Sequence, residues 1–292
     1  MNLQAKEPQK SSWNFSMGKN KFLIATLAVI AVICAFRFYD YLTDGFSIAH
    51  ITYPLPSKNE WETSLPPKEL DSILDQTFTY LGKGSQSYVF LSADKKYVIK
   101  FFKFRHIKPN PFLNSLPHVG PIATWQDYRE FRLNKKISRV FKGYKTAHDY
   151  NQKESGLIYV RLNQDPPLNK SIYAYNKLGM GQQIELNHTI FIIQEAAEPT
   201  EKVLEKALQN NDRDLINKRI EQLIALYISE YQKGIYDKDH AILRNTGFIG
   251  DRPLHFDVGN LTYDPSIKDP ALYQKDLEIV TKKLDDWLKN HK

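Results

Sequence analysis

A glycine-rich turn followed at short range by a strand with one lysine is the strongest constraint on this fold. The two segments read Leu81-Gly82-Lys83-Gly84-Ser85-Gln86-Ser87-Tyr88-Val89-Phe90 and Tyr97-Val98-Ile99-Lys100-Phe101-Phe102. Gly82 and Gly84 lack a Cβ, so a ligand can approach the backbone closely there. Lysine is costly to bury without a partner, so Lys100 is interpreted as a cation that faces a ligand. Taken singly, an ordinary hairpin and a strand-edge lysine with its ammonium in water explain the same residues.

Hydrophobic patterning predicts a strand-rich half followed by a helix-rich half. The predicted strands are 78–81, 88–93, 97–104, 157–162, 189–194, 246–249 and 253–257. The predicted helices are 67–74, 124–141, a striped helix that ends at Gly234, and 270–290. The sequence Thr124-Trp125-Gln126-Asp127 resembles a capping box that would open the second of these helices. A proline-rich loop containing Pro109 and Pro117 precedes that helix.

An acid on the 124–141 helix is a candidate partner for Lys100. At 100° per residue Glu130 points with Ile137 and Phe141, along the apolar stripe. An inward-facing carboxylate favours a cation, and Lys100 is the natural one. A glutamate at the edge of the stripe that reaches solvent is the simpler reading, and Asp127 is the alternative acid.

Two further polar residues lie far downstream, after the striped helix. Asn245 follows a loop that contains Asp237, Asp239 and His240, and Asp257 ends the segment His255-Phe256-Asp257-Val258-Gly259. An amide oxygen and a carboxylate suit Mg²⁺ when phosphate oxygens and water complete the coordination. An Asx turn explains Asn245 by itself, and a strand-ending turn explains Asp257.

Taken together, these motifs resemble the protein-kinase-like superfamily over about residues 77–260. The resemblance implies an α+β, two-lobed domain with a small antiparallel-sheet N-lobe and a truncated helical C-lobe. It also implies ATP and Mg²⁺ as cofactors. The implied roles are phosphate or nucleotide contacts for Gly82, Gly84, Ser87, Val89 and Lys100, a helix carboxylate at Glu130, and metal ligands at Asn245 and Asp257.

The sequence departs from the family pattern at three points. Ser87 stands at the third glycine, and His240 stands where the family has its catalytic aspartate. A one-residue insertion would restore Asp239 as the base that orients and deprotonates an acceptor hydroxyl. Little chain follows Asp257, and no Ala-Pro-Glu is present. Three readings therefore stay open: ATP–Mg²⁺-dependent phosphoryl transfer to a hydroxyl acceptor, a pseudokinase that serves as a membrane-tethered binding or scaffold module, and a structural domain with coincidental motifs.

The apolar run Phe22–Phe36, with an aromatic rim to Tyr41, predicts a membrane anchor at 22–41 and hence a lipid-bilayer partner. A cleaved signal peptide and a buried core helix are the alternatives. Expected boundaries are a polar tail at 1–21, a linker at 42–75, and a kinase-like domain at 76–292 divided near residue 195. Lysines before the run favour a cytoplasmic N-terminus and an extracytoplasmic or lumenal domain, whereas ATP use favours a cytoplasmic one.

Composition and charge limit the kinds of partner and chemistry that the chain could have. The net charge is +7 and the pI is about 9.1, yet no low-complexity basic tract or zinc-spaced set is present, so no nucleic-acid partner is expected. Cys34 is the single cysteine and lies within the apolar run. An intramolecular disulfide framework and a cysteine nucleophile in the remaining chain are thereby excluded. The acceptor, or a protein partner in its place, is not identified by the sequence.

Overall fold

The computed structural model describes residues 16–104 and 115–291 in a mixed α+β fold. The chain divides into two compact units, Met1–Phe46 and Ser47–Lys292. The described part of the first unit is dominated by α1 (Ser16–Leu42), so the helix begins six residues before the expected anchor at 22–41. Within α1, Lys21–Leu42 has a mean hydropathy of 2.3 and is long and apolar enough to cross a membrane, a test that a signal sequence also passes.

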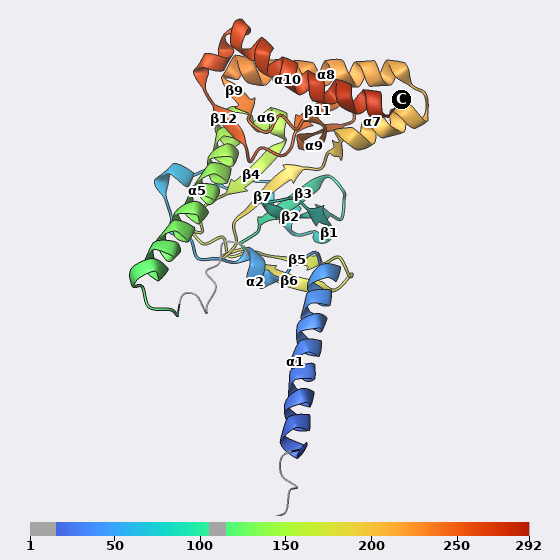
Figure 1. Cartoon of the computed structure of the whole chain (residues 1–292). Coiled ribbons are helices and arrows are strands. Elements are labelled where there is room, and N and C mark those ends of the chain that lie inside the picture. The colour runs from blue at the N-terminus through green and yellow to red at the C-terminus, as the bar shows by residue number, and fades with distance from the viewer. Residues whose placement is uncertain (1–15, 105–114, 292) are drawn as a thin grey trace, which may run out of the picture. The chain divides into compact units, whose positions relative to one another are not determined.

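A seven-stranded sheet forms the strand-rich part of Ser47–Lys292 (Figure 1). Its order is β4-β7-β3-β2-β1-β5-β6, and every neighbouring pair is antiparallel except β1 and β5. The strands are β1 (Thr77–Lys83), β2 (Ser87–Ser92), β3 (Tyr97–Phe102), β4 (Leu157–Arg161), β5 (Ser171–Tyr175), β6 (Gly181–Glu185) and β7 (Phe191–Glu195). Five of these were predicted. The β5–β6 hairpin was missed because the Gly-Gln-Gln start of β6 has low strand propensity.

One face of β3 packs in an aromatic core, and the other face presents Lys100. On one face Phe101 packs edge-on against Phe90 at 5.9 Å and lies 6.2 Å from the Phe191 ring. Lys100 lies on the other face, as alternation predicts, and its register neighbours are Val89 on β2 and Ile192 on β7. The aromatic core therefore anchors the strand that presents the lysine.

Helix α5 (Gly120–Tyr150) is much longer than the predicted 124–141. It begins after Val119 with Pro121 in its first turn, so the capping box at Thr124 is wrong: that residue lies one turn inside the helix. Phe141 on α5 packs edge-on against Trp61 at 4.9 Å and against Phe102 at 5.2 Å. These contacts fix the helix to the sheet. Residues 105–114, which include Pro109 of the predicted loop, lie outside the described residues.

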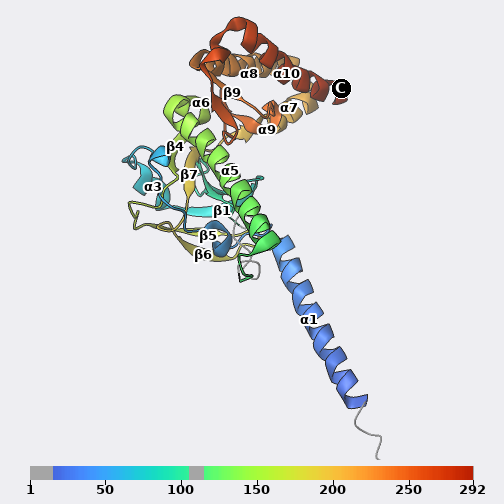
Figure 2. The same cartoon turned by 60° about the vertical axis from the view of Figure 1, so that its left-hand side comes forward.

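Three helices pack together to form the helical part: α7 (Thr200–Gln209), α8 (Arg213–Lys233) and α10 (Pro270–Asn290) (Figures 1 and 2). Their shared core includes Leu204, Tyr227, Tyr231 and Leu284. The predicted bounds of α10 are confirmed, and α8 ends before Gly234, whose φ of 85° suits glycine. The intervening elements are β8 (Glu198–Pro199), β9 (Ile235–Asp237), α9 (Ile242–Asn245), β10 (Thr246–Ile249), β11 (Arg252–His255) and β12 (Leu261–Tyr263).

Much of the expected linker packs on the folded unit. It contains α2 (Ile48–Ile51), a 3₁₀ turn at Asn59–Trp61 and α3 (Leu70–Leu74). Ile51, Trp61 and Ile73 are buried, and Thr52 bridges Thr189. Prolines suggested a linker, but scattered apolar side chains hold this segment in place.

Candidate functional site

A cavity of about 540 Å³ lies between the glycine-rich turn, strand β3 and the segment after β11. Six residues singled out in the sequence contribute to its wall: Gly82, Gly84, Ser87, Val89, Lys100 and Asp257. The first five come from β1–β3, whereas the aspartate comes from 157 residues further along. Tertiary folding therefore brings the side chains of Lys100 and Asp257 to the wall of one cavity.

Lys100 is buried, with only 7% of its surface exposed. Its Nζ donates a 2.7 Å hydrogen bond to the main-chain carbonyl of Phe256. Burial lowers the pKa of Lys100 to about 8, and the negative charge of Asp257 opposes that fall. The ammonium is therefore mostly charged at neutral pH, although it is held in an environment that disfavours the charge.

Asp257 and Asn245 are joined through the main chain. The Asn245 carbonyl accepts the N–H groups of Phe256 and Asp257 at 2.8 and 3.1 Å. Asn245 itself is only 4% exposed, and its amide nitrogen donates to Asp237 at 2.8 Å. Among the described residues no side chain forms a hydrogen bond or ion pair with the Asp257 carboxylate, so that carboxylate is available inside the cavity. Asn245 lies behind the wall, not in it.

The predicted contact between Lys100 and Glu130 is wrong. Glu130 is exposed and borders a different cavity, beside His118 and Trp125. The α5 residue in the Lys100 cavity is Tyr144, 14 residues later, which is roughly 21 Å along a helix with a 1.5 Å rise. Fourteen residues are almost four turns, so the predicted helix face is right and the position along it is not. Burial, and then the charge of Asp257, raise the Tyr144 pKa well above its usual value.

The two aspartates of the downstream loop have opposite environments. Asp239 is exposed and does not line the cavity, and its main-chain carbonyl accepts a hydrogen bond from Lys283 at 2.8 Å. Asp237 is 1% exposed and accepts from the N–H of Asp239 at 2.9 Å as well as from Asn245. Asp239 has no contact with the cavity, and Asp237 is fully engaged behind it.

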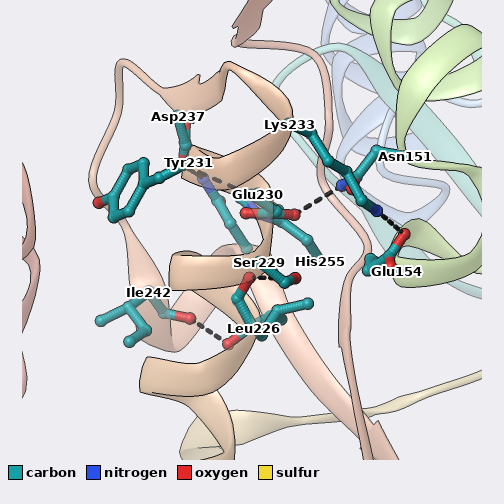
Figure 3. A network of polar contacts seen from close by, with 12 residues as sticks. Asn151, Glu154, Leu226, Ser229, Glu230, Tyr231, Lys233, Asp237, Ile242 and His255 are labelled. Atoms are coloured by element: carbon teal, nitrogen blue, oxygen red, sulfur yellow. Dashed lines mark hydrogen bonds and ion pairs between the residues drawn. The ribbon is translucent and has the colours of Figure 1, made fainter. Parts of the chain in front are cut away.

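A buried histidine connects this loop to the helical part (Figure 3). His255 Nδ1 lies 3.1 Å from Glu230, and its Nε2 lies 3.6 Å from Asp237. Burial alone would lower the His255 pKa, but the negative charges of Glu230 and Asp237, together with the Glu230 hydrogen bond, raise it to about 10. Asn151 donates to Glu230 at 2.6 Å and so closes the network. An imidazolium between two buried carboxylates therefore holds Asp237, and through it Asn245, behind the cavity.

Two glycines allow segments of the cavity wall to pack closely against one another. A Cβ on Gly143, next to Tyr144, would lie 2.5 Å from the Val258 carbonyl, and a Cβ on Gly259 would lie 2.7 Å from the Gln86 side chain. Helix α5 and the glycine-rich turn therefore both touch the Asp257–Gly259 segment. Gly82 differs, because a Cβ there would meet open space and its φ is not in the left-handed region. Gly82 lies at a register shift in the β1–β2 pairing, and the described residues leave the space beside it open.

Several residues of the wall carry no sequence signal that distinguishes them. Gln194 at the end of β7, Lys202 on α7 and Arg244 on α9 border the cavity with Tyr144. Two further acids there, Glu195 and Glu198, are paired with Arg252 and Lys206, each at 2.5 Å. Only the aromatic stripe of α5 hints at Tyr144. In the described part of the chain no cluster of three metal-ligand side chains occurs, so a bound Mg²⁺ would rely on Asp257 together with ligand oxygens.

A scan against family models and a search of curated proteins found no match. Weak matches to solved structures include WbdD in complex with the kinase inhibitor LY294002 and a second WbdD structure, at 14% and 15% identity. They cover 69% and 68% of this chain and 36% and 35% of theirs, with TM-scores of 0.30 and 0.29. The Rv3197–erythromycin complex from Mycobacterium tuberculosis matches at 13% identity, 66% and 48% coverage, and a TM-score of 0.30. The chain thus spans about a third to a half of these solved chains, and the functional proposal rests on the cavity.

Proposed function

We propose that the chain is a membrane-anchored, kinase-like protein that binds ATP with Mg²⁺ in the Lys100 cavity and transfers a phosphoryl group to a hydroxyl acceptor. The observation that carries the proposal is the buried ammonium of Lys100 in one cavity with the free carboxylate of Asp257. A volume of about 540 Å³ lies within the range of about 300–1,000 Å³ that is typical of small-molecule sites.

Each part of a nucleotide has a matching part of the wall. Val89 and the 195–197 segment supply an apolar slot and main-chain groups for a planar base. Gly82 lets phosphates approach the backbone, and Lys100 supplies a cation for them. Asp257 would hold Mg²⁺, which usually binds one or two carboxylates together with phosphate oxygens and water. The open space beside Gly82 supports this assignment, since no described residue lies within 4 Å of a Cβ placed there and a ligand could occupy the space.

The chemistry asked of the protein is mainly positioning and charge neutralisation. An acceptor oxygen attacks the terminal phosphorus, the bond to ADP breaks, and the hydroxyl proton leaves to a base or to water. Asp239 is the proposed base, and that role requires the 238–241 loop to bring its carboxylate to the cavity. Lys202 and Arg244 add positive charge at the wall, where the transferring group would develop negative charge.

A second candidate function is a pseudokinase that binds nucleotide and serves as a tethered scaffold. One observation favours it: Asp239 lies outside the cavity and Asp237 is locked by Asn245 and His255. Among the described acids that line the cavity, only Asp257 is then free of an ion pair, and it is assigned to the metal. Binding without transfer is the expected behaviour of this alternative.

The membrane part of the proposal rests on α1. We assign Lys21–Leu42 as a single span because its length and hydropathy match a bilayer core of about 30 Å. Protease accessibility of Ser47–Lys292 in intact cells determines which side carries the domain. A compartment without ATP would exclude catalysis.

A thermal-shift titration of the full chain in detergent with ATP, with and without Mg²⁺, tests nucleotide binding. A Mg²⁺-dependent rise in melting temperature that saturates with ATP supports the site, and no shift with any nucleotide refutes it. Transfer of labelled terminal phosphate to a cell-extract acceptor then separates the enzyme from the pseudokinase. Asp239→Asn should abolish transfer and leave the shift unchanged if Asp239 is the base.

A further inference from the structure

One face of α5 carries aromatic rings and positive charges and no acid. Projected at 100° per residue, every residue of 125–142 within about 80° of one direction is aromatic or basic. The aromatic members are Trp125, Tyr128 and Phe131, and the basic members are Arg129, Arg132, Lys135, Lys136, Arg139 and Lys142. We call these nine residues the α5 basic face. Glu130 points to the opposite side, so the acids of this stretch do not neutralise the face.

The rings of this face are open to solvent. Trp125, Tyr128 and Phe131 are 45%, 58% and 62% exposed. Large exposed aromatics on one patch are unusual on a protein surface that contacts only water. The buried residues described in α5 begin at Ile137, so these three rings lie on a stretch of the helix outside the core and are not required for its packing.

The cations lie among these rings. Arg129 lies 5.5 Å from the centre of the Trp125 ring, and Arg132 lies 5.9 Å from that of Tyr128. Within the residues that the structure describes, none of the six cations forms an ion pair. From Arg129 to Lys142, the face therefore carries six positive charges without a described ion-pair partner along about 20 Å of helix, at a 1.5 Å rise per residue.

We propose that the α5 basic face docks on the surface of an anionic phospholipid bilayer. Aromatic rings at headgroup depth together with lysine and arginine are the features of helices that lie in a membrane interface. The positive charge complements anionic headgroups, each cation near such a surface adding to the attraction.

The position of the face within the folded unit agrees with this occupant. Figures 1 and 2 place the first turns of α5 and helix α2, where the chain enters Ser47–Lys292, at the end opposite α8 and α10. Residues 43–46 alone join α1 to this unit, a reach of roughly 17 Å even when extended. A chain anchored by α1, as proposed above, therefore keeps this end of the unit within reach of lipid. The inference rests on that part of the proposed function and goes beyond it.

The test uses the full chain with Cys34→Ser, reconstituted into vesicles. A bimane label at Tyr128→Cys reports contact with nitroxide-bearing lipids through quenching, and the matched label is at Glu221→Cys on the exposed side of α8. In phosphatidylcholine vesicles that contain phosphatidylglycerol, we expect at least twofold stronger quenching at position 128 than at 221. Pure phosphatidylcholine should reduce that difference. Equal quenching at both positions in the anionic vesicles overturns the proposal.

Charge reversal separates docking from simple proximity. Arg132→Glu with Lys135→Glu should bring quenching at position 128 down to that at 221. Lys282→Glu with Lys289→Glu on α10 makes the same change of net charge and should have no effect. Unchanged quenching in the first pair would count against docking. Emission at 128 that responds to an RNA oligonucleotide but not to lipid would assign the face to nucleic acid and overturn the lipid proposal.

A separate measurement shows whether α1 inserts into the bilayer. Alkaline extraction removes the chain from vesicles if α1 does not insert, whereas quenching at position 128 still reports on the α5 basic face. The two parts of the membrane assignment can therefore fail independently.

Discussion

The Lys100 ammonium donates a 2.7 Å hydrogen bond to the Phe256 carbonyl, the residue directly before Asp257. One side chain from the sheet thus holds the main chain of the segment that carries the cavity's free carboxylate. Because the bond goes to a main-chain oxygen, the carboxylate keeps both oxygens for a ligand. In the proposed nucleotide site this ammonium would also face the phosphates, so replacement of Lys100 is the most direct test of the site.

Lys100→Met should weaken ATP binding about tenfold to a hundredfold, since a hydrogen bond to a charged group contributes about 1.5–3 kcal/mol. The methionine keeps a similar volume, so the fold should persist. Isothermal calorimetry of both proteins measures the change. Lys96→Met, at the exposed β2–β3 turn, is the matched control. Equal affinity in the Lys100 variant and wild type would remove Lys100 from the site.

The depressed pKa of Lys100 has a consequence for stability. Its folded pKa of about 8 lies below the unfolded value of 10.5, so the unfolded chain binds more protons between these values and the free energy of unfolding rises with pH. The burial cost of roughly 3 kcal/mol is present below pH 8 and relieved by about pH 10.5. Lys100→Met buries no charge, so below this window its free energy of unfolding in urea should exceed that of wild type. That difference should shrink as pH rises across the window. An advantage that does not change with pH would contradict the burial of the charge.

His255 should contribute to stability in the opposite direction. Its folded pKa of about 10 lies above the unfolded value of 6.5, so the contribution is complete below about pH 6.5 and is lost as pH rises toward 10. At pH 7, His255→Leu leaves Glu230 and Asp237 buried without a cation and should cost about 3–5 kcal/mol. Chemical denaturation measures this cost.

Two comparisons sharpen the His255 prediction. Adding Glu230→Gln to His255→Leu should recover part of the loss, because one uncompensated charge is removed. Lys218→Ala breaks an exposed pair with Asp251 and should cost less than about 1 kcal/mol. A His255→Leu cost as small as that of Lys218→Ala would show that the buried network contributes little.

Two glycine-to-alanine changes should affect different properties, one the stability of the fold and the other the affinity for ATP. Gly143→Ala puts a Cβ about 2.5 Å from the Val258 carbonyl and should cost about 1–3 kcal/mol by overpacking. Gly82→Ala meets open space, so its melting temperature should stay near that of wild type while ATP affinity falls. Melting curves and ATP titrations on the same two variants distinguish the effects. A stable Gly82→Ala with full affinity would take the phosphates away from the glycine-rich turn.

Metal dependence should reside in Asp257. Asp257→Asn removes the one carboxylate at the wall that is free of ion pairs within the described chain, so ATP should bind with the same affinity in Mg²⁺ and in EDTA. Wild type should bind more weakly in EDTA. Asp239→Asn serves as the matched control, because its side chain lies outside the cavity, and it should keep the Mg²⁺ effect. A Mg²⁺ effect that persists in Asp257→Asn would place the metal elsewhere.

Local sequence determined the elements that position the site. Alternation in Tyr97–Phe102 predicts the side of the sheet on which Lys100 lies. Gly234, which has a positive φ, ends α8, and the amphipathic pattern predicts the bounds of α10. These features depend on neighbouring residues alone, so they can be read without a structure. The apolar run of α1 belongs with them, because its length and composition suffice to identify it.

Tertiary structure alone decided which polar groups meet. Helical periodicity is nearly unchanged by a shift of four turns, so the pattern could not distinguish Glu130 from Tyr144 as the α5 residue beside Lys100. Likewise, the choice between Asp237 and Asp239 as the buried acid depends on His255, which approaches from another strand. Pairings over such separations depend on how whole elements pack, and a periodic sequence pattern contains no information about translation along a helix.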